Sequence, residues 1–295
     1  MKKVTFAIPA YNHENYIKET LDSIWEDDYP CREIVIINDG SSDGTAEVIK
    51  NWCDSKGWVN IVFISWPNRG ITATLNKLIE MSSGDYIRLF SSDDLLSFGS
   101  TRELIDILED DENTLAVFGD AAVIDKDGAL IHASALISNG GDKRKLLDNK
   151  LLTEEIVSNW AVSGPVILIK KCFFENHGAY DEAMLVDDWD VYTRLVATGG
   201  LRFVDSCVAK YRIHGENTSK TRVINKRIMN LLSQASVVDR NINLFRDVRI
   251  RSLFLAEKYL LLTKATYLSF GIHRCGLNFL KYIAYKLVAN MRVKF

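Results

Sequence analysis

Residues 34–45 read Ile-Val-Ile-Ile-Asn-Asp-Gly-Ser-Ser-Asp-Gly-Thr, so that four aliphatic residues break directly into acidic, glycine and serine residues. An aliphatic run of this kind is typical of a strand buried on both faces of a parallel sheet, and the polar residues after it are typical of a tight turn. Residues 86–94 repeat the pattern, because Tyr-Ile-Arg-Leu-Phe runs into Ser-Ser-Asp-Asp. Since open α/β sheets bind ligands at the carboxyl ends of their strands, Asp39 and Asp93 are candidate site residues.

Strand and helix patterns alternate on both sides of these stretches. Hydrophobic spacing predicts strands at residues 4–9, 33–38, 60–65, 86–90, 115–124, 162–170 and 208–213. It predicts helices at 14–26, 45–56, 71–82, 100–109 and 187–198, a hairpin turn at 125–128, and a less regular stretch at 132–160 with a loop at 139–142. This alternation predicts the α/β class, with a Rossmann-like, mostly parallel sheet flanked by helices.

The composition limits the class of protein. With 295 residues and 47% hydrophobic content, the chain can bury a large core. Its five cysteines form no Cys-x-x-Cys pair, which argues against a disulfide framework or structural zinc and favours a reducing, cytoplasmic setting. Five residues between Lys3 and Pro9 are too few for a signal-peptide core, and no apolar stretch approaches the ~20 residues that span a bilayer.

The charge is divided unevenly along the chain. Residues 220–295 hold 15 Lys and Arg against three Asp and Glu, whereas residues 1–219 hold 21 against 36. We therefore expect an acidic body over 1–219 and a basic, mostly helical C-terminal extension over 220–295. One helix face of the extension carries Leu277, Leu280, Ile283, Ala284, Leu287 and Val288. This face predicts either packing on the body or an interfacial helix that meets anionic lipid.

Short blocks of small, acidic and aromatic residues punctuate the body. They read Pro9-Ala10-Tyr11-Asn12, Asn38-Asp39-Gly40-Ser41-Ser42-Asp43-Gly44-Thr45, Asn68-Arg69-Gly70, Ser92-Asp93-Asp94, Gly178-Ala179-Tyr180-Asp181-Glu182, Asp187-Asp188-Trp189-Asp190 and Tyr211-Arg212-Ile213-His214-Gly215-Glu216-Asn217-Thr218-Ser219. In order and spacing these blocks resemble the family 2 inverting glycosyltransferases of the bacterial polysaccharide-assembly type. The resemblance covers about residues 3–219 and implies the A-type glycosyltransferase fold, with a catalytic domain over 1–219.

The resemblance implies a nucleotide-sugar site at the first strand ends. In the family, an aspartate at the place of Asp39 hydrogen-bonds the nucleobase, and backbone around Ala10 and Tyr11, next to Pro9, lines the same pocket. Arg69 either helps to hold the base or diphosphate or is a surface arginine. Taken alone, Asp39 is also consistent with a turn that caps the next helix.

Ser92 and Asp93 stand where the family has the end of its Asp-x-Asp motif. Asp93 takes the final acidic position, which implies a divalent cation, Mn²⁺ or Mg²⁺, that bridges the donor phosphates. Ser91 replaces the first aspartate of the motif, a departure from the family pattern, although Mg²⁺ is often held by one or two carboxylates together with phosphates. Asp94 is a candidate partner of Asp93, and a helix N-terminal cap is the alternative for the pair.

The later blocks supply the remaining site residues. Asp188 is the predicted general base, which takes the proton from the acceptor hydroxyl during inverting transfer, and Asp187 and Asp190 are the residues that could be mistaken for it. A plain acidic cluster at a helix start is the alternative. Trp189 is a candidate surface for the acceptor sugar. His214 resembles the family histidine that contacts the metal or the diphosphate, with a structural histidine as the alternative.

The predicted reaction is metal-dependent hexosyl or N-acetylhexosaminyl transfer from a nucleoside diphosphate-sugar, most simply a UDP-sugar, to a glycan hydroxyl. We expect a lipid-linked acceptor in cell-surface polysaccharide synthesis, and a protein bound peripherally to the inner face of the cell membrane. Nucleic acid is not expected among its partners. Because of Ser91, the alternative is a catalytically inactive protein of the same fold that binds sugar nucleotides or glycans. A hydrolase would not need the nucleotide pocket that Asp39 implies.

Overall fold

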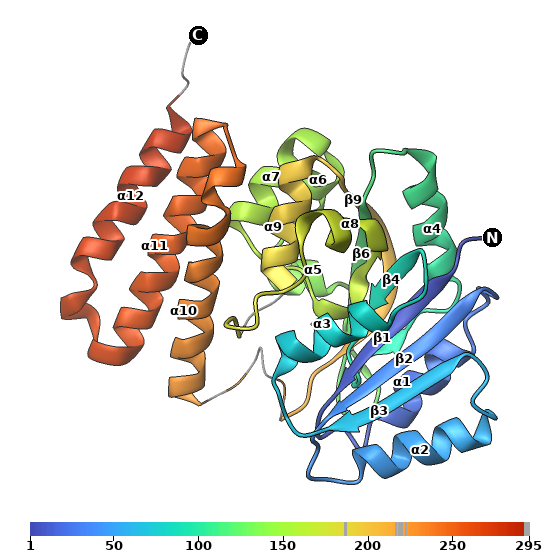
Figure 1. Ribbon diagram of the computed structural model, residues 1–295. Coiled ribbons are helices and arrows are strands. Elements are labelled where there is room, and N and C mark those ends of the chain that lie inside the picture. The colour runs from blue at the N-terminus through green and yellow to red at the C-terminus, as the bar shows by residue number, and fades with distance from the viewer. Residues whose placement is uncertain (186–187, 216, 218–220, 222, 292–295) are drawn as a thin grey trace.

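The computed structural model describes residues 1–185, 188–215, 217, 221 and 223–291. Within these residues a nine-stranded sheet forms the centre of the protein, and helices flank it (Figure 1). The strands are β1 (Val4–Ala10), β2 (Arg32–Asp39), β3 (Ile61–Trp66), β4 (Tyr86–Leu89), β5 (Leu95–Leu96), β6 (Ala116–Ile124), β7 (Leu130–His132), β8 (Ile167–Lys170) and β9 (Leu201–Arg212). The helices are α1 (Ile17–Trp25), α2 (Thr45–Ser55), α3 (Ile71–Met81), α4 (Ser100–Asp110), α5 (Ala135–Ser138), α6 (Lys143–Leu147), α7 (Asn149–Ser158), α8 (Lys171–His177), α9 (Asp188–Thr198), α10 (Ile224–Asn241), α11 (Val248–Phe270) and α12 (Gly276–Asn290), with 3₁₀ turns η1 (Gly164–Val166), η2 (Ile242–Leu244) and η3 (Ile272–Arg274).

The first four long strands form a parallel sheet in the order β3-β2-β1-β4. All residues of β2 after Arg32 are buried, as expected for a parallel strand covered on both faces. The strands and helices predicted for residues 4–110 are confirmed, and so is the α/β class. Because β1, β2 and β4 point the same way, their carboxyl ends meet at one edge of the sheet, and the polar residues that follow them meet there too.

The second half of the sheet is mixed rather than parallel. Strand β8 runs antiparallel between β4 and β6, whereas β6 and β9 are parallel. The strand predicted at 162–170 is shorter, because Gly164–Val166 form η1 around Pro165, which has no N–H for a ladder. Strand β9 begins well before the predicted residue 208.

Arg88 joins β4 to the second half of the molecule. Its side chain is fully buried, and it donates to Thr101 Oγ1 at 2.8 Å and to the Val208 carbonyl at 3.0 Å. Burial lowers the pKa of this guanidinium to about 10. The hydrogen bonds offset part of the cost of burying the charge and fix α4 and β9 against the central strand.

Residues 132–160, expected to be mostly irregular, contain α5, α6 and α7, although the predicted loop at 139–142 is present. Each of these helices is preceded by a side chain that accepts a hydrogen bond from its first turn: Ser134, Asp142 and Asp148. These capping residues were the available signal, since helices this short show little hydrophobic periodicity.

The basic extension folds into three helices on one side of the body (Figure 1). Helices α10 and α11 join the core, where Val237, Val238 and Phe254 are fully buried. Helix α12 packs on α11 and is the outermost helix. The helix therefore packs on the body, but its apolar face is turned away from α11. Within the described part of the chain, no helix combines the length and apolarity needed to cross a membrane.

Candidate active site

The loops that follow β1 and β2 are tied together at the sheet edge. Asn12 has a φ of +53°, and its Oδ1 accepts from the Ser42 N–H at 2.8 Å while its own N–H donates to Ser41 Oγ at 2.9 Å. The N–H of Glu14 donates to Asp43 Oδ2 at 3.1 Å. These side chains hold the two turns in one arrangement before any ligand arrives.

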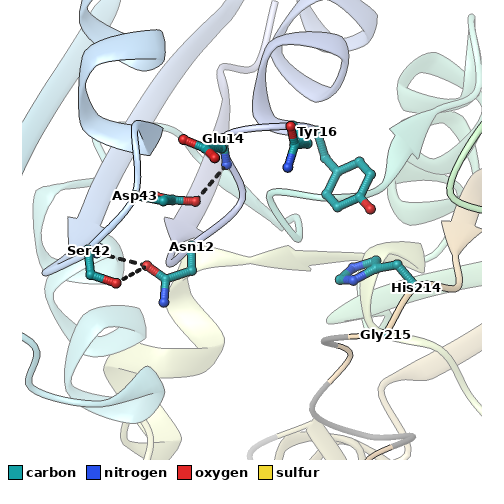
Figure 2. Close-up of a pocket in the computed structure, with 8 residues that line it drawn as sticks. Asn12, Glu14, Tyr16, Ser42, Asp43, His214 and Gly215 are labelled. Atoms are coloured by element: carbon teal, nitrogen blue, oxygen red, sulfur yellow. Dashed lines mark hydrogen bonds between the residues drawn. The ribbon is translucent and has the colours of Figure 1, made fainter.

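A cavity of about 450 Å³ lies beside these loops. Asn12, Ser42 and Asp43 stand on one side of it, and Tyr16 and His214 on the other (Figure 2). The rings of Tyr16 and His214 stack with centroids 4.7 Å apart. Hydrogen-bonding groups dominate the lining, which suits a polar ligand.

Asp39, at the end of β2, is buried and organises the loop that follows β3. Its Oδ1 accepts from Trp66 Nε1 and from the Arg69 N–H, both at 2.8 Å, and its Oδ2 accepts from the Gly70 N–H at 3.0 Å. The exposed guanidinium of Arg69 lies over the Trp66 ring, 4.6 Å from its centroid. Since a carboxylate has about four acceptor positions, Oδ2 keeps one for a ligand.

The predicted nucleotide residues of β1 lie next to this corner. Pro9 and Ala10 pair with β2 immediately before Asp39, and Tyr11 beyond them is 48% exposed. Gly40 has a φ of +71°, and a Cβ there would collide with the backbone nitrogen of Asn68. The turns after β1, β2 and β3 are therefore brought together at this corner.

Asp93 and His214 meet although they come from distant parts of the chain. Asp93 Oδ2 lies 2.9 Å from His214 Nε2 and 3.8 Å from His13 Nε2. The three ligand atoms lie within 4.8 Å of one another. Ser92 Oγ lies 2.7 Å from His13 Nδ1 and orients the ring. Two imidazoles and one carboxylate form a set that binds divalent transition metals well.

The backbone around this cluster is fixed by Arg212, whose side chain is buried. Its Nε donates to the Asp93 carbonyl at 2.9 Å, and its N–H donates to Asp94 Oδ1 at 2.8 Å. The His214 N–H donates to Asn217 Oδ1 at 2.6 Å. Burial and the neighbouring Asp93 carboxylate raise the pKa of Asp94 well above its usual range. Asp94 therefore serves as a buried anchor beneath the cluster.

Asp188 is the first residue of α9 and reaches the same edge. A Cβ on Gly164 would lie 3.5 Å from Asp188 Oδ2 and 3.4 Å from Ser91 Oγ, so both side chains border this glycine. Asp190 instead points into the protein, where it binds Arg194 Nε at 2.9 Å and Asn241 Nδ2 at 2.8 Å. Asp190 is thus a structural residue. Asp187, and the predicted block residues 216 and 218–219, lie outside the described part of the chain.

The prediction that Trp189 supports a sugar is wrong. Its side chain is 1% exposed, its indole N–H donates to the Ile156 carbonyl at 2.7 Å, and its ring packs on Phe254 at 5.4 Å between centroids. The helical turn that directs Asp188 to the edge directs the next residue into the core. Trp189 therefore anchors α9 to α7 and α11.

His13 is the site residue that the sequence analysis missed. It follows Pro9-Ala10-Tyr11-Asn12 at the end of a strand parallel to the one that precedes Asp93. That position was the available signal, because parallel neighbours deliver their next residues to the same edge. A lone histidine in a turn cannot be recognised as a site residue until the pairing of β1 with β4 is known.

The chain is similar to known proteins in sequence and in fold. The model of the family described as Glycosyl transferase family 2 matches residues 5–165. Chondroitin synthase of Pasteurella multocida is 27% identical over 216 residues, which are 73% of this chain and 21% of that protein. Curated relatives are matched over roughly a fifth to two thirds of their own length.

Two solved structures share the fold. S. aureus TarS 1–349 in complex with UDP-GlcNAc has a TM-score of 0.68 and 14% identity, over 98% of this chain and 90% of that chain. A mannosyltransferase from Pyrobaculum calidifontis in complex with GDP-Man and Mn²⁺ has a TM-score of 0.61 and 19% identity, over 100% of this chain and 76% of that chain. With the family model covering more than half of its residues, this chain belongs to glycosyl transferase family 2.

Proposed function

We propose that this chain transfers a sugar from a nucleoside diphosphate-sugar, a UDP-sugar, to a hydroxyl of a glycan acceptor with inversion at the anomeric carbon. The observation that carries the proposal is the alignment of three acidic sites along one sheet edge. Asp39 ends β2, Asp93 follows β4, and Asp188 borders Gly164, as does Ser91 in the turn after β4. His13 connects the turn after β1 to Asp93.

The donor nucleotide binds in the corner made by the turns after β1, β2 and β3. The free acceptor position on Asp39 Oδ2 takes an N–H of the base, and Arg69 is placed to meet the diphosphate or the face of the base. The backbone of Pro9, Ala10 and Tyr11 closes the pocket. The solved structures with UDP-GlcNAc and GDP-Man support a sugar-nucleotide donor on this fold.

A divalent cation fits the cluster of Asp93, His13 and His214. The fit rests on the three ligand atoms, which lie within 4.8 Å of one another, and on the chemistry of a carboxylate with two imidazoles. When bound, a cation there supplies Lewis-acid stabilisation of the charge on the departing nucleoside diphosphate. Ser92 holds His13 in place, and Arg212 holds the Asp93 backbone.

Asp188 is the general base in this proposal. The N-terminus of α9 favours a negative charge on Asp188, and Gly164, which has no side chain, leaves a space in which an atom would lie 3.5 Å from Asp188 Oδ2 and 3.4 Å from Ser91 Oγ. An acceptor hydroxyl in that space gives its proton to Asp188 as its oxygen attacks from the side opposite the leaving group. Asp190 does not compete, since its carboxylate is bound by Arg194 and Asn241.

The acceptor is a lipid-linked glycan of cell-surface polysaccharide synthesis. The basic C-terminal extension supports a location at an anionic membrane surface, the peripheral inner face of the cell membrane. Since Trp189 is buried, no residue is assigned to the acceptor sugar.

The experiment is release of nucleoside diphosphate from a panel of UDP- and GDP-sugars with Mn²⁺ or Mg²⁺ present. We expect slow hydrolysis of one UDP-sugar, faster turnover when an acceptor glycan is added, and a product whose anomeric configuration is inverted by NMR. Asp93→Ala should abolish metal-dependent binding and release, whereas Asp127→Ala, in the exposed turn before β7, should behave as the parent.

Two outcomes would contradict the proposed inverting transfer. Thermal stabilisation by a sugar nucleotide without any diphosphate release, across the panel and with acceptors, would support an inactive binding protein. Retention of the anomeric configuration would contradict the role given to Asp188.

A further inference from the structure

The last helix presents an apolar face to solvent. The outer face of α12, defined here as Leu277, Leu280, Ala284, Leu287 and Met291 just past its end, follows a three- and four-residue spacing that aligns these side chains in one stripe. Leu277, Leu280 and Leu287 are 67%, 66% and 58% exposed. Seven of the 28 exposed large hydrophobic side chains in the described residues fall within 276–291.

The opposite face of α12 makes the contacts with α11, and these are aromatic and polar. Tyr285 stacks on Tyr259 with centroids 5.6 Å apart, and Asn278 Nδ2 donates to Thr266 Oγ1 at 3.4 Å. The helix is thus docked through its less apolar side. The apolar stripe is an additional surface of the folded chain rather than part of its core.

One lysine borders the outer face. On a helical projection Lys281 lies next to Leu277 at its border, whereas Lys286 lies on the side of α12 that faces α11 and Glu257. Lys281 Nζ lies over the Tyr259 ring, 4.9 Å from its centroid. Residues 276–295 contain no Asp or Glu. An apolar stripe with a lysine at its border, on a helix that contains no acidic residue, matches a membrane whose interior is apolar and whose headgroups are negatively charged.

The charges of α11 and α12 also indicate whether a second copy of the chain or a membrane covers the outer face. Glu257 is the single acidic residue in 248–295, and it acts on the α11–α12 side, near Lys264 and Lys286, not on the outer face. Pairing of the outer faces of two copies would bring the Lys281 side chains to the edge of the interface with no acidic partner from α12. An anionic lipid surface supplies the missing charge.

We propose that α12 lies flat on an anionic lipid membrane, with its outer face among the acyl chains and Lys281 at the headgroups. This inference deepens the proposed function, since it provides the surface on which a lipid-linked acceptor would be met. It concerns binding alone and is tested without donor or acceptor.

The experiment is flotation of the full chain with vesicles of phosphatidylcholine alone or with ~30% phosphatidylglycerol, a typical anionic content for such tests. We expect binding to the anionic vesicles that weakens with salt. Leu280→Gln/Leu287→Gln should lower the partition coefficient about tenfold or more, and Lys281→Gln should lower it about fivefold and reduce its salt dependence. Leu130→Gln/Ile137→Gln is the matched control, with side chains 66% and 57% exposed elsewhere, and should bind as the parent.

Thermal midpoints of all variants confirm folding, and donor hydrolysis without vesicles should be unchanged in each, which separates this inference from the proposed function. Absence of binding by the parent chain, or equal binding by the α12 variants, overturns the proposal. So does a parent dimer in analytical ultracentrifugation that the leucine variant converts to monomer without loss of lipid binding, because the face would then be an interface between copies.

Discussion

His214 Nε2 lies 2.9 Å from Asp93 Oδ2, although 121 positions separate the two residues in the chain. The contact exists because β4 and β9 both end at the edge where β1 delivers His13. Ser91 stands where the resemblance implies an aspartate, and the candidate metal cluster combines one carboxylate with the imidazoles of His13 and His214. The mixture of nitrogen and oxygen ligands determines which cation the site prefers.

The first prediction is that the site prefers Mn²⁺ to Mg²⁺ and depends on His13. Imidazole nitrogens suit transition metals, whereas Mg²⁺ favours oxygen ligands. His13→Gln should weaken Mn²⁺ binding about tenfold to 100-fold, measured by electron paramagnetic resonance with UDP present. His132→Gln, at an exposed position in β7, is the control. Unchanged Mn²⁺ affinity in His13→Gln would remove this histidine from the ligand set.

Asp188→Asn should separate catalysis from binding. An amide keeps the size of the side chain but accepts no proton, so kcat for transfer should fall by ~10² to 10⁴ while the Kd for the donor stays within about twofold. Asp106→Asn, on the exposed side of α4, should leave both constants unchanged. Transfer by Asp188→Asn at the parent rate would mean that another group takes the proton.

Asp39→Asn should disturb the nucleotide corner. The three N–H groups that meet Asp39 need acceptors, and an amide turns one oxygen into an NH₂ that faces a donor. We expect the affinity for UDP in calorimetry to fall about tenfold or more, with a loss of roughly 1–3 kcal/mol in the free energy of unfolding. Asp54→Asn is a matched control, because Asp54 accepts an indole N–H from Trp58 on the surface. If Asp39→Asn binds UDP as tightly as the parent does, the nucleobase does not bind at Asp39.

Trp189 variants should affect stability rather than acceptor affinity. Trp189→Ala should lower the free energy of unfolding by roughly 3–5 kcal/mol, because it removes a buried ring and leaves the Ile156 carbonyl without its donor. Trp189→Phe should keep the KM for the acceptor. If a well-folded Trp189→Phe variant showed a rise in that KM alone, Trp189 would have to contact the acceptor sugar after all.

Glu33 should make folding stability depend on pH in acid. Burial acts to raise the pKa of this carboxyl, but hydrogen bonds from Lys3, Ser83 and Thr5 outweigh burial and lower the pKa from 4.5 to about 2. The folded state therefore holds the ionised form more strongly than the unfolded state does. The resulting stabilisation, about 3 kcal/mol at most, is present above pH ~4.5 and is lost as the pH falls towards ~2.

Urea unfolding of the parent and Glu33→Gln between pH 2 and 7 measures this contribution. The difference in free energy of unfolding should be largest near neutral pH and shrink in acid. A difference that is constant over the whole range would mean that the charge of Glu33 contributes nothing.

The sequence determined the strands and helices of the first 110 residues, because buried parallel strands are continuous aliphatic runs and their turns carry acidic and small residues. It also placed Asp39 and Asp93 at strand ends on one edge of the sheet, whereas His214 was named only through the family resemblance. Which way a side chain points was decided only by the tertiary structure. Asp188 and Trp189 are adjacent in sequence, yet one borders the site and the other is enclosed by α7 and α11.

Long-range pairing likewise decided the role of His13 and the exposure of α12. A histidine in a turn becomes a candidate ligand only when β1 and β4 pair in register, and a sequence carries no local signal for that register. The apolar stripe of α12 was legible as a pattern, but periodicity states only that one face is apolar. What that face meets depends on how α11 docks, and here α11 binds the opposite face.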